Sequence, residues 1–140
     1  SGSSANLVAL SSLTSKKIKN KIEEGSEVIT AAVGFPTTVN PIFQNNLTPV
    51  FVDSEIGTYN PTFESVANAV TKKTKAIFLA HTLGNPFEVD KIRELSIEKN
   101  IWLIEDNCDA LGSKINDHYT GTFGDISTLS FLSCSSYNYG

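Results

Sequence analysis

The sequence contains no methionine, two cysteines and no long hydrophobic run. No stretch approaches the roughly 20 apolar residues of a membrane-spanning helix, and no signal-peptide pattern opens the chain. Cys108 and Cys134 are too few for a disulfide framework, which favours a cytoplasmic protein. Because a complete translation product begins with Met unless it is trimmed, we expect the chain to be an internal piece of a larger protein.

Positive charge is scarce as well. Eleven Lys and Arg residues stand against fifteen Asp and Glu residues, so the formal net charge is −4. This balance gives no reason to expect a nucleic acid or an anionic membrane as a partner. Apolar residues make up 40% of the 140 positions and charged residues 19%, which is typical of a globular chain with one domain.

Short apolar segments alternate with helix-compatible segments along the chain. The apolar segments are continuous, as in strands that are buried on both faces. The predicted strands are 27–32, 48–52, 76–80, 101–104 and 126–131, and the predicted helices are 5–13, 37–45, 61–70 and 89–99. We expect residues 16–24 to form a solvated helix end and a turn. This repetition predicts a three-layer α/β/α domain with a mostly parallel sheet.

Ligands bind to sheets of this kind beyond the carboxyl ends of the strands, and polar or small residues gather at several such places. Residues 1–6 (SGSSAN) lead into an apolar helix, so their amides suit a phosphate, or a serine simply caps the helix. Residues 34–38 (GFPTT) follow the first strand, where Phe35 either stacks on a planar ring or packs in the core.

Residues 101–109 (IWLIEDNCD) put three carboxylates and one thiol just past a predicted strand. A carboxylate held there can keep a heterocyclic nitrogen protonated, bind a metal or cap the next helix. Cys108 is either a metal or cluster ligand or a small buried hydrophobe. We interpret His81 as a hydrogen-bonding residue at a strand end and His118 as a surface residue.

Taken together, these segments resemble the DegT/DnrJ/EryC1/StrS family of pyridoxal-phosphate-dependent sugar aminotransferases. Within that family they are most similar to the CDP-4-dehydro-6-deoxyglucose 3-dehydrases of deoxysugar, lipopolysaccharide and O-antigen biosynthesis. The matching stretches keep the family's order and are residues 1–6, 27–45, 49–53, 57–60, 75–90, 102–113 and 120–131. The resemblance implies that residues 1–131 are part of the large domain of a fold-type I transferase, which binds pyridoxal or pyridoxamine 5'-phosphate.

The resemblance also implies roles for single residues around that cofactor. Ser3 and Ser4 fall where the cofactor phosphate meets a helix N-terminus, and Ser130 matches a serine that completes the phosphate site. Phe35 falls where an aromatic ring stacks on the pyridine ring. Asp106 falls where a carboxylate pairs with the pyridinium nitrogen and keeps the ring an electron sink.

Two further residues carry the features of the dehydrase branch. Asp109 stands where the aminotransferases have a Gln near the ring hydroxyl, and Cys108 matches the first of four cysteines that bind a 2Fe-2S cluster. The other three cysteines would lie beyond residue 140. The implied reaction is 3-deoxygenation of a CDP-activated keto-deoxysugar, with a histidine base, a reductase as electron donor and a homodimeric enzyme.

The resemblance breaks after Phe131. The dehydrases continue roughly as Tyr-Pro-Ala-His-His-Ile-Thr-Met-Gly, and Ser135 stands where the first histidine, the catalytic base, belongs. A hydroxyl is far too weak a base for that role. Removing one T from a possible coding sequence restores the family's residues, so we hypothesise that 132–140 is an out-of-frame tail of an inactive fragment. The alternatives are a nucleotide-sugar aminotransferase, with Lys at the base position, and a non-catalytic remnant that uses Ser135 as written.

Overall fold

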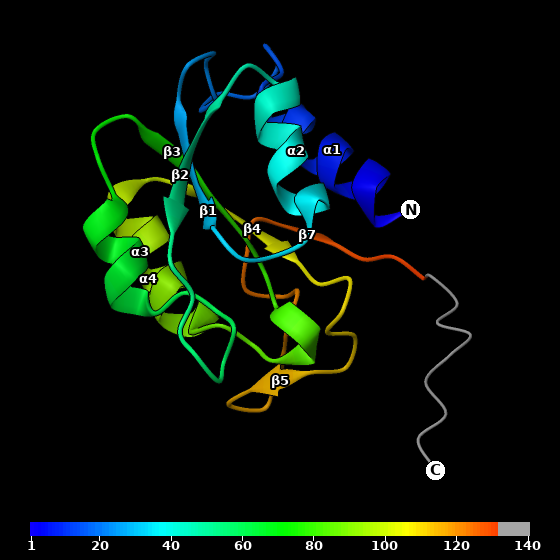
Figure 1. The fold of residues 1–140 in the computed structure, drawn as a ribbon. Coiled ribbons are helices and arrows are strands. Elements are labelled where there is room, and N and C mark those ends of the chain that lie inside the picture. Colours follow the sequence, from blue (N-terminus) through cyan, green and yellow to red (C-terminus); the bar gives the residue numbers. More distant parts are fainter. Residues whose placement is uncertain (132–140) are drawn as a thin grey trace.

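A parallel five-stranded sheet forms the centre of the computed structural model, which describes residues 1–131 (Figure 1). The strand order is β2–β1–β3–β4–β7, and every neighbouring pair is parallel. The strands are β1 (Glu27–Ala31), β2 (Thr48–Val52), β3 (Thr74–Ala80), β4 (Trp102–Asp106) and β7 (Ile126–Thr128). The predicted α/β architecture with a mostly parallel sheet is therefore confirmed.

Helices cover both faces of this sheet. Helices α1 (Gly2–Leu13) and α2 (Pro36–Gln44) lie on one face, and α3 (Phe63–Ala69) and α4 (Val89–Lys99) lie on the other (Figure 1). Side chains alternate along β3 and β4, so the two central strands contribute to a separate core on each face. Buried members are Leu10, Ile42, Phe78 and Ile104 on the α1 and α2 face, and Ile77, Leu79, Val89 and Leu103 on the α3 and α4 face.

Most element boundaries differ from the prediction by one to three residues, and two differences affect the site. The strand predicted at 101–104 extends to Asp106, because Glu105 and Asp106 continue the pairing with Leu79 and Ala80 of β3. The strand predicted at 126–131 ends at Thr128. Residues 16–24 form turns rather than a helix end, because α1 already stops at Leu13.

Three small elements were not predicted. The 3-10 helix η1 (Thr82–Gly84) follows β3, and β5 (Lys114–Ile115) and β6 (His118–Tyr119) form a short hairpin. The hairpin turns at Asn116 and Asp117, whose φ angles of 47° and 65° are tolerated best by such short polar residues. His118 is exposed, as predicted.

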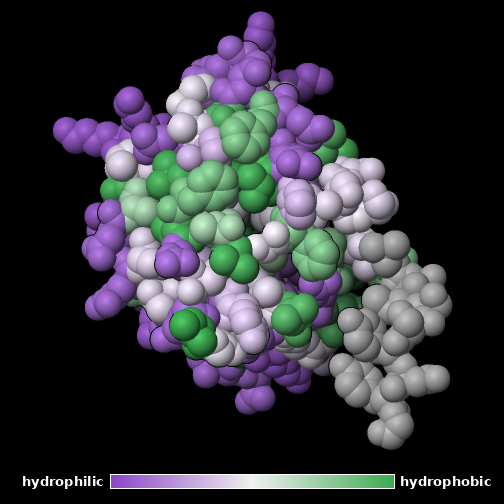
Figure 2. Space-filling model, in the orientation of Figure 1, coloured by the Kyte–Doolittle hydropathy of each residue, from purple (hydrophilic) through white to green (hydrophobic). Residues whose placement is uncertain are grey.

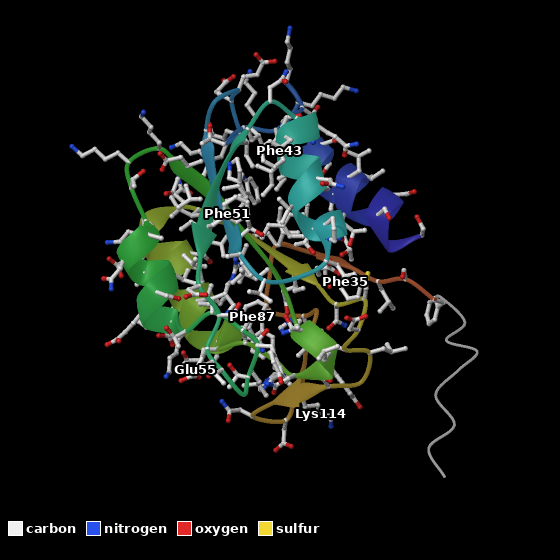
Figure 3. All side chains as sticks on the ribbon, viewed as in Figure 1. Phe35, Phe43, Phe51, Glu55, Phe87 and Lys114 are labelled. Carbon is white, nitrogen blue, oxygen red and sulfur yellow. The ribbon has the colours of Figure 1, made fainter. Side chains whose placement is uncertain are left out.

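The edge strand β2 carries part of the apolar surface. Figure 2 shows apolar side chains gathered over β2 and the nearby end of α2, where Phe51 and Phe43 are about half exposed (Figure 3). Within residues 1–131, no helix is both long and apolar enough to cross a lipid bilayer.

Candidate cofactor site

A cavity of about 210 Å³ opens at the carboxyl edge of the sheet, between the start of α1, the start of α2 and the end of β4. Figure 3 labels Phe35 at this edge. Six residues predicted from the sequence line the cavity: Ser3, Phe35, Asp106, Cys108, Asp109 and Ser130. They come from distant parts of the chain and meet because the carboxyl ends of parallel strands share one edge. Their individual roles remain predictions.

The N-terminus of α1 forms one wall of the cavity. The helix begins at Gly2, and the Oγ of Ser1 caps it by accepting a bond from the Ser4 amide at 3.4 Å. The amides of Gly2 and Ser3 lie in the first turn, where a helix supplies no backbone acceptor. The helix therefore has a serine cap and also presents N–H groups, at the positive end of its dipole, to an anion. Ser4 lines a neighbouring hollow instead of this cavity.

Gly2 allows this helix end to approach the opposite wall closely. A Cβ atom at Gly2 would lie 3.0 Å from the Sγ of Cys108 and 3.2 Å from the Oγ of Ser130. Both contacts are tighter than most real Cβ contacts, so a larger residue would require the Cys108 and Ser130 side chains to shift by a few tenths of an ångström. The absence of a side chain at Gly2 thus allows the first-turn amides of α1 and the hydroxyl of Ser130 to line the same cavity.

Asp106 is the most constrained polar group of the site, with 5% of its surface exposed. Its Oδ2 accepts hydrogen bonds from Asn6 Nδ2 at 2.6 Å and from Thr38 Oγ1 at 2.8 Å. Its Oδ1 accepts one from the backbone amide of Cys108 at 3.2 Å. All three donors are neutral, and no cationic side chain in the described part of the chain forms an ion pair with Asp106. A carboxylate held in this way suits a protonated ring nitrogen as its missing partner.

Phe35 is 61% exposed, so the alternative that it packs in the core is wrong. Its ring lies directly before α2, whose first residue is Pro36, and it lines the cavity. A rigid aromatic side chain with a free face beside a buried carboxylate and a helix N-terminus fits a planar phosphorylated heterocycle. The residues present therefore fit pyridoxal or pyridoxamine phosphate.

Cys108 does not by itself fit an iron–sulfur cluster. Burial, together with the nearby Asp106 carboxylate, raises the pKa of its thiol to about 11, so the thiol is protonated at neutral pH. A 2Fe-2S cluster needs four ligands, mainly thiolates. Between residues 1 and 131, no group of three His, Cys, Asp or Glu side chains is placed to hold a metal ion.

Glu105 does not belong to the cavity, so the expected cluster of three carboxylates is wrong. Glu105 and Asp106 are neighbours on a strand and therefore point to opposite faces of the sheet. The Glu105 carboxylate is fully buried and accepts a bond from His81 Nε2 at 2.9 Å, which confirms His81 as a hydrogen-bonding residue at a strand end. It also accepts bonds from the backbone amides of Gly121, Phe123 and Gly124.

The pKa of Glu105 reflects a balance between burial and these donors. Burial alone raises the pKa of a carboxyl group, but the bonds from His81, Gly124 and Gly121 outweigh it and leave the pKa of Glu105 below its ordinary value. The Glu105 carboxylate is therefore ionised, and its hydrogen-bonding capacity is filled from within the protein.

Asn6, Thr38 and Thr128 were not singled out from the sequence, although they surround Asp106. Asn6 offers a usable signal, because it is a poor helix former within an apolar helical segment and a buried amide must find partners. Thr38 lies in the GFPTT segment but gives no signal of its own. Ser135, the predicted position of the catalytic base, lies outside the described residues.

The fold and the cavity define a class: an α/β protein whose sheet edge fits a phosphorylated pyridine cofactor. The chain belongs to the DegT/DnrJ/EryC1/StrS aminotransferase family, whose model matches residues 1–137. Its fold is that of the fold-type I transferases, which include pyridoxal-phosphate-dependent aminotransferases and sugar dehydratases.

Three similar proteins illustrate the match. The chain is 61% identical over 132 residues to the dTDP-4-dehydro-2,6-dideoxy-D-glucose 3-dehydratase of Saccharopolyspora spinosa, covering 94% of the chain and 29% of that protein. It is 56% identical to the lipopolysaccharide biosynthesis protein RfbH of Salmonella typhimurium, covering 94% and 30%. A solved structure of the E. coli GDP-4-keto-6-deoxy-D-mannose-3-dehydratase with hydrated pyridoxal phosphate superposes with a TM-score of 0.81 and 41% identity, covering 88% and 31%.

The chain thus spans about a third of the length of the relatives it matches.

Proposed function

We propose that the protein to which this chain belongs is a 3-dehydratase of a nucleotide-activated 4-keto-6-deoxy sugar that uses pyridoxamine or pyridoxal phosphate. Residues 1–131 would form part of its large domain, and CDP would carry the sugar, in O-antigen or related deoxysugar synthesis in the cytoplasm. The observation that carries the proposal is Asp106, a buried carboxylate with only neutral donors that faces a cavity beside a helix N-terminus. The relatives named as 3-dehydratases support the choice of reaction.

In this proposal each wall of the cavity has one task. The first-turn amides of α1, with Ser3 and Ser130, bind the phosphate, and Phe35 covers one face of the ring. Asp106 would hold a proton on the ring nitrogen, and Asp109, which also lines the cavity, would serve the ring hydroxyl. When bound, the cofactor supplies an electron sink for the carbon from which a proton is removed. The proton acceptor belongs at position 135, where a histidine would serve and a serine would not.

Cys108 is proposed as one ligand of a 2Fe-2S cluster in the full-length protein, with a reductase as electron donor. The other ligands would come from outside residues 1–131, because Cys108 is the one thiol that the described residues place on the cavity and they form no group of three metal ligands. A homodimer is also part of the proposal. Iron and sulfide analysis of the purified full-length protein tests the cluster independently of the cofactor site.

Asp106→Asn in the full-length protein tests the cofactor site. The substitution keeps the shape but removes the charge, so we expect pyridoxal phosphate to bind about 100-fold more weakly, as for the loss of one well-formed ionic hydrogen bond. Absorbance titration of the ring measures the affinity. Asp117→Asn, an exposed change in the β5–β6 turn, is the matched control and should leave the affinity unchanged. Equal affinities in all three proteins would refute the proposal.

The reaction itself separates the candidate functions. Incubation with CDP-, dTDP- and GDP-linked 4-keto-6-deoxy sugars and a reductant should yield a product without its 3-hydroxyl. A 4-amino sugar formed from an amino donor would favour an aminotransferase, a function supported by the 40% identity to the dTDP-4-dehydro-2,3,6-trideoxy-D-glucose 4-aminotransferase of Saccharopolyspora spinosa. If no product forms and the reading frame is intact through Ser135, the result would favour a non-catalytic remnant. The coding DNA around residues 132–140 decides whether that segment is an out-of-frame tail.

A further inference from the structure

Asn6 is a fully buried side chain of α1 that connects four elements. Its Nδ2 donates to Asp106 Oδ2 of β4 at 2.6 Å and to the Thr37 carbonyl of α2 at 3.2 Å. Its Oδ1 accepts a bond from Thr128 Oγ1 of β7 at 2.6 Å. The amide thus has partners on both of its ends, and all of them come from other elements.

Thr128 and Asp106 together fix the orientation of the Asn6 amide. Asp106 accepts and cannot donate when ionised, so it requires the NH₂ end of the amide. The Thr128 hydroxyl occupies the other end and donates to the amide oxygen. A reversed amide would place its oxygen against the Asp106 carboxylate and leave a buried repulsion. The hydroxyl of Thr128 therefore helps to keep a donor directed at Asp106.

This donor also determines which part of the Asp106 carboxylate remains available. Oδ2 already accepts two bonds, from Asn6 and Thr38, whereas Oδ1 accepts one from the Cys108 amide. Each carboxylate oxygen has two lone pairs. Oδ1 is consequently the oxygen with capacity left for a further donor.

We propose that Thr128 and Asn6 are positioning residues: Thr128 orients the Asn6 amide, and Asn6 holds Asp106 so that Oδ1 receives the ring nitrogen of the cofactor. The inference rests on the proposed function, which places a ring nitrogen at Asp106. Asn6 and Thr128 are absent from the residues that line the cavity, and both are at most 5% exposed. They act on the cofactor through Asp106 rather than by contact.

The test compares Thr128→Val with Thr128→Ser in the full-length protein. Valine has the shape of threonine without the hydroxyl, and serine keeps the hydroxyl without the methyl group. Two probes are titrated: pyridoxal phosphate and 1-deazapyridoxal phosphate, in which a C–H group replaces the ring nitrogen. We expect Thr128→Val to bind pyridoxal phosphate about tenfold more weakly, the upper range for the loss of one hydrogen bond between neutral groups, and to bind the deaza probe like the wild type. Thr128→Ser should recover most of the affinity for pyridoxal phosphate.

A merely structural role of Thr128 gives a different pattern. If Thr128→Val only loosened the cavity, the affinities for both probes would fall equally, and that result would overturn the inference. Unchanged affinities for both probes would overturn it as well. If Thr128→Val does not fold, Thr128→Ala, which removes the hydroxyl and leaves space, is judged by the same difference between the probes. A wild-type protein that binds neither probe would instead remove the proposed function, and the inference with it.

Discussion

Glu105 and Asp106 are adjacent carboxylates on β4, yet they lie in opposite surroundings. Glu105 faces the α3 and α4 side, where His81 and three backbone amides satisfy it completely. Asp106 faces the α1 and α2 side, where three neutral donors leave it capacity for one more partner at an open cavity. The comparison shows that the face of the sheet, rather than the residue type, separates a carboxylate whose partners are all internal from one that keeps capacity for a further partner at a cavity.

The two groups also organise different parts of the chain. Glu105 accepts hydrogen bonds from backbone amides of the 120–124 loop and from His81, so it holds this loop near the end of β3. His81 in turn stacks on Phe87, with ring centroids 4.3 Å apart. Asp106 accepts hydrogen bonds from Asn6 of α1 and Thr38 of α2, so it holds the starts of both helices at the cavity. Substitution of Glu105 should therefore reduce stability first, and substitution of Asp106 should reduce cofactor binding first.

The largest expected effect is that of Glu105→Ala. It leaves His81 and three buried amides without their acceptor, so we expect the free energy of unfolding to fall by about 3–5 kcal/mol, as for a broken buried ion pair. Urea unfolding followed by circular dichroism measures the change. Glu98→Ala, on the exposed side of α4, is the control and should change stability by less than about 0.5 kcal/mol. If Asp106→Ala were as destabilising as Glu105→Ala, the distinction between the two carboxylates would fail.

A smaller loss is expected for Gly124→Ala. A Cβ atom there would lie 2.8 Å from the Leu103 carbonyl oxygen and 3.2 Å from Cγ of Glu105, so the loop must move away from the carboxylate. We expect a loss of about 1–3 kcal/mol, typical of overpacking. Gly34→Ala is the matched control, because a Cβ at Gly34 meets no atom within 4 Å. Equal unfolding midpoints for both variants would mean that the loop does not depend on its close approach to Glu105.

The sequence predicted the sheet and the location of the cavity but not the separation of these two carboxylates. Continuous apolar segments identify strands buried on both faces, and the order of strands and helices places their carboxyl ends together. The placement of the Glu105 and Asp106 side chains on opposite faces of the sheet depends on whether the strand continues through both residues. Two charged residues argue against such a continuation, and it becomes favourable only because His81 and the 120–124 loop satisfy Glu105.

The partners of Asp106 could be predicted only in part. An Asn in an apolar helix, such as Asn6, indicates that its amide has hydrogen-bond partners. However, its partners Asp106 and Thr128 are 100 and 122 residues away along the chain. Local patterns carry no information about such pairs, because tertiary packing brings them together. The segment 132–140 contributes nothing to this comparison, because it lies outside the described residues.

Acid should weaken the Glu105 side of the molecule. The pKa of Glu105 in the folded protein lies below its ordinary value of 4.5, so its ionised form adds stability above that pH. The added stability is lost as the pH falls through the lower folded pKa. We therefore expect the wild type to lose stability below about pH 4.5 more steeply than Glu105→Gln, measured by urea unfolding from pH 7 to pH 3.

Glu88 provides the control for this experiment. Its pKa is also lowered, chiefly by the hydrogen bond from Lys91, but the pair is exposed to solvent and contributes little to stability. Glu88→Gln should consequently leave the steepness of the acid loss almost unchanged. A similar flattening in Glu105→Gln and Glu88→Gln would show that burial of the Glu105 carboxylate is not what links stability to pH.

The smallest effect concerns the thiol beside Asp106 and leaves stability unchanged. Burial and the Asp106 carboxylate raise the pKa of Cys108 to about 11, so iodoacetamide should react slowly at pH 8 and faster as the pH rises toward that value. Cys134→Ser removes the other cysteine of residues 1–140, and the reaction is followed on the peptide that contains Cys108. Asp106→Asn removes a nearby negative charge, lowers the pKa of Cys108 and should accelerate alkylation at pH 8 severalfold, measured by mass spectrometry.

Glu105→Gln lies on the other face of β4 and should leave that rate unchanged, because the Glu105 carboxylate is not among the groups that raise the pKa of Cys108. Equal acceleration by both substitutions would mean that the sheet does not isolate the two carboxylates electrostatically, since both would then act on the same cavity.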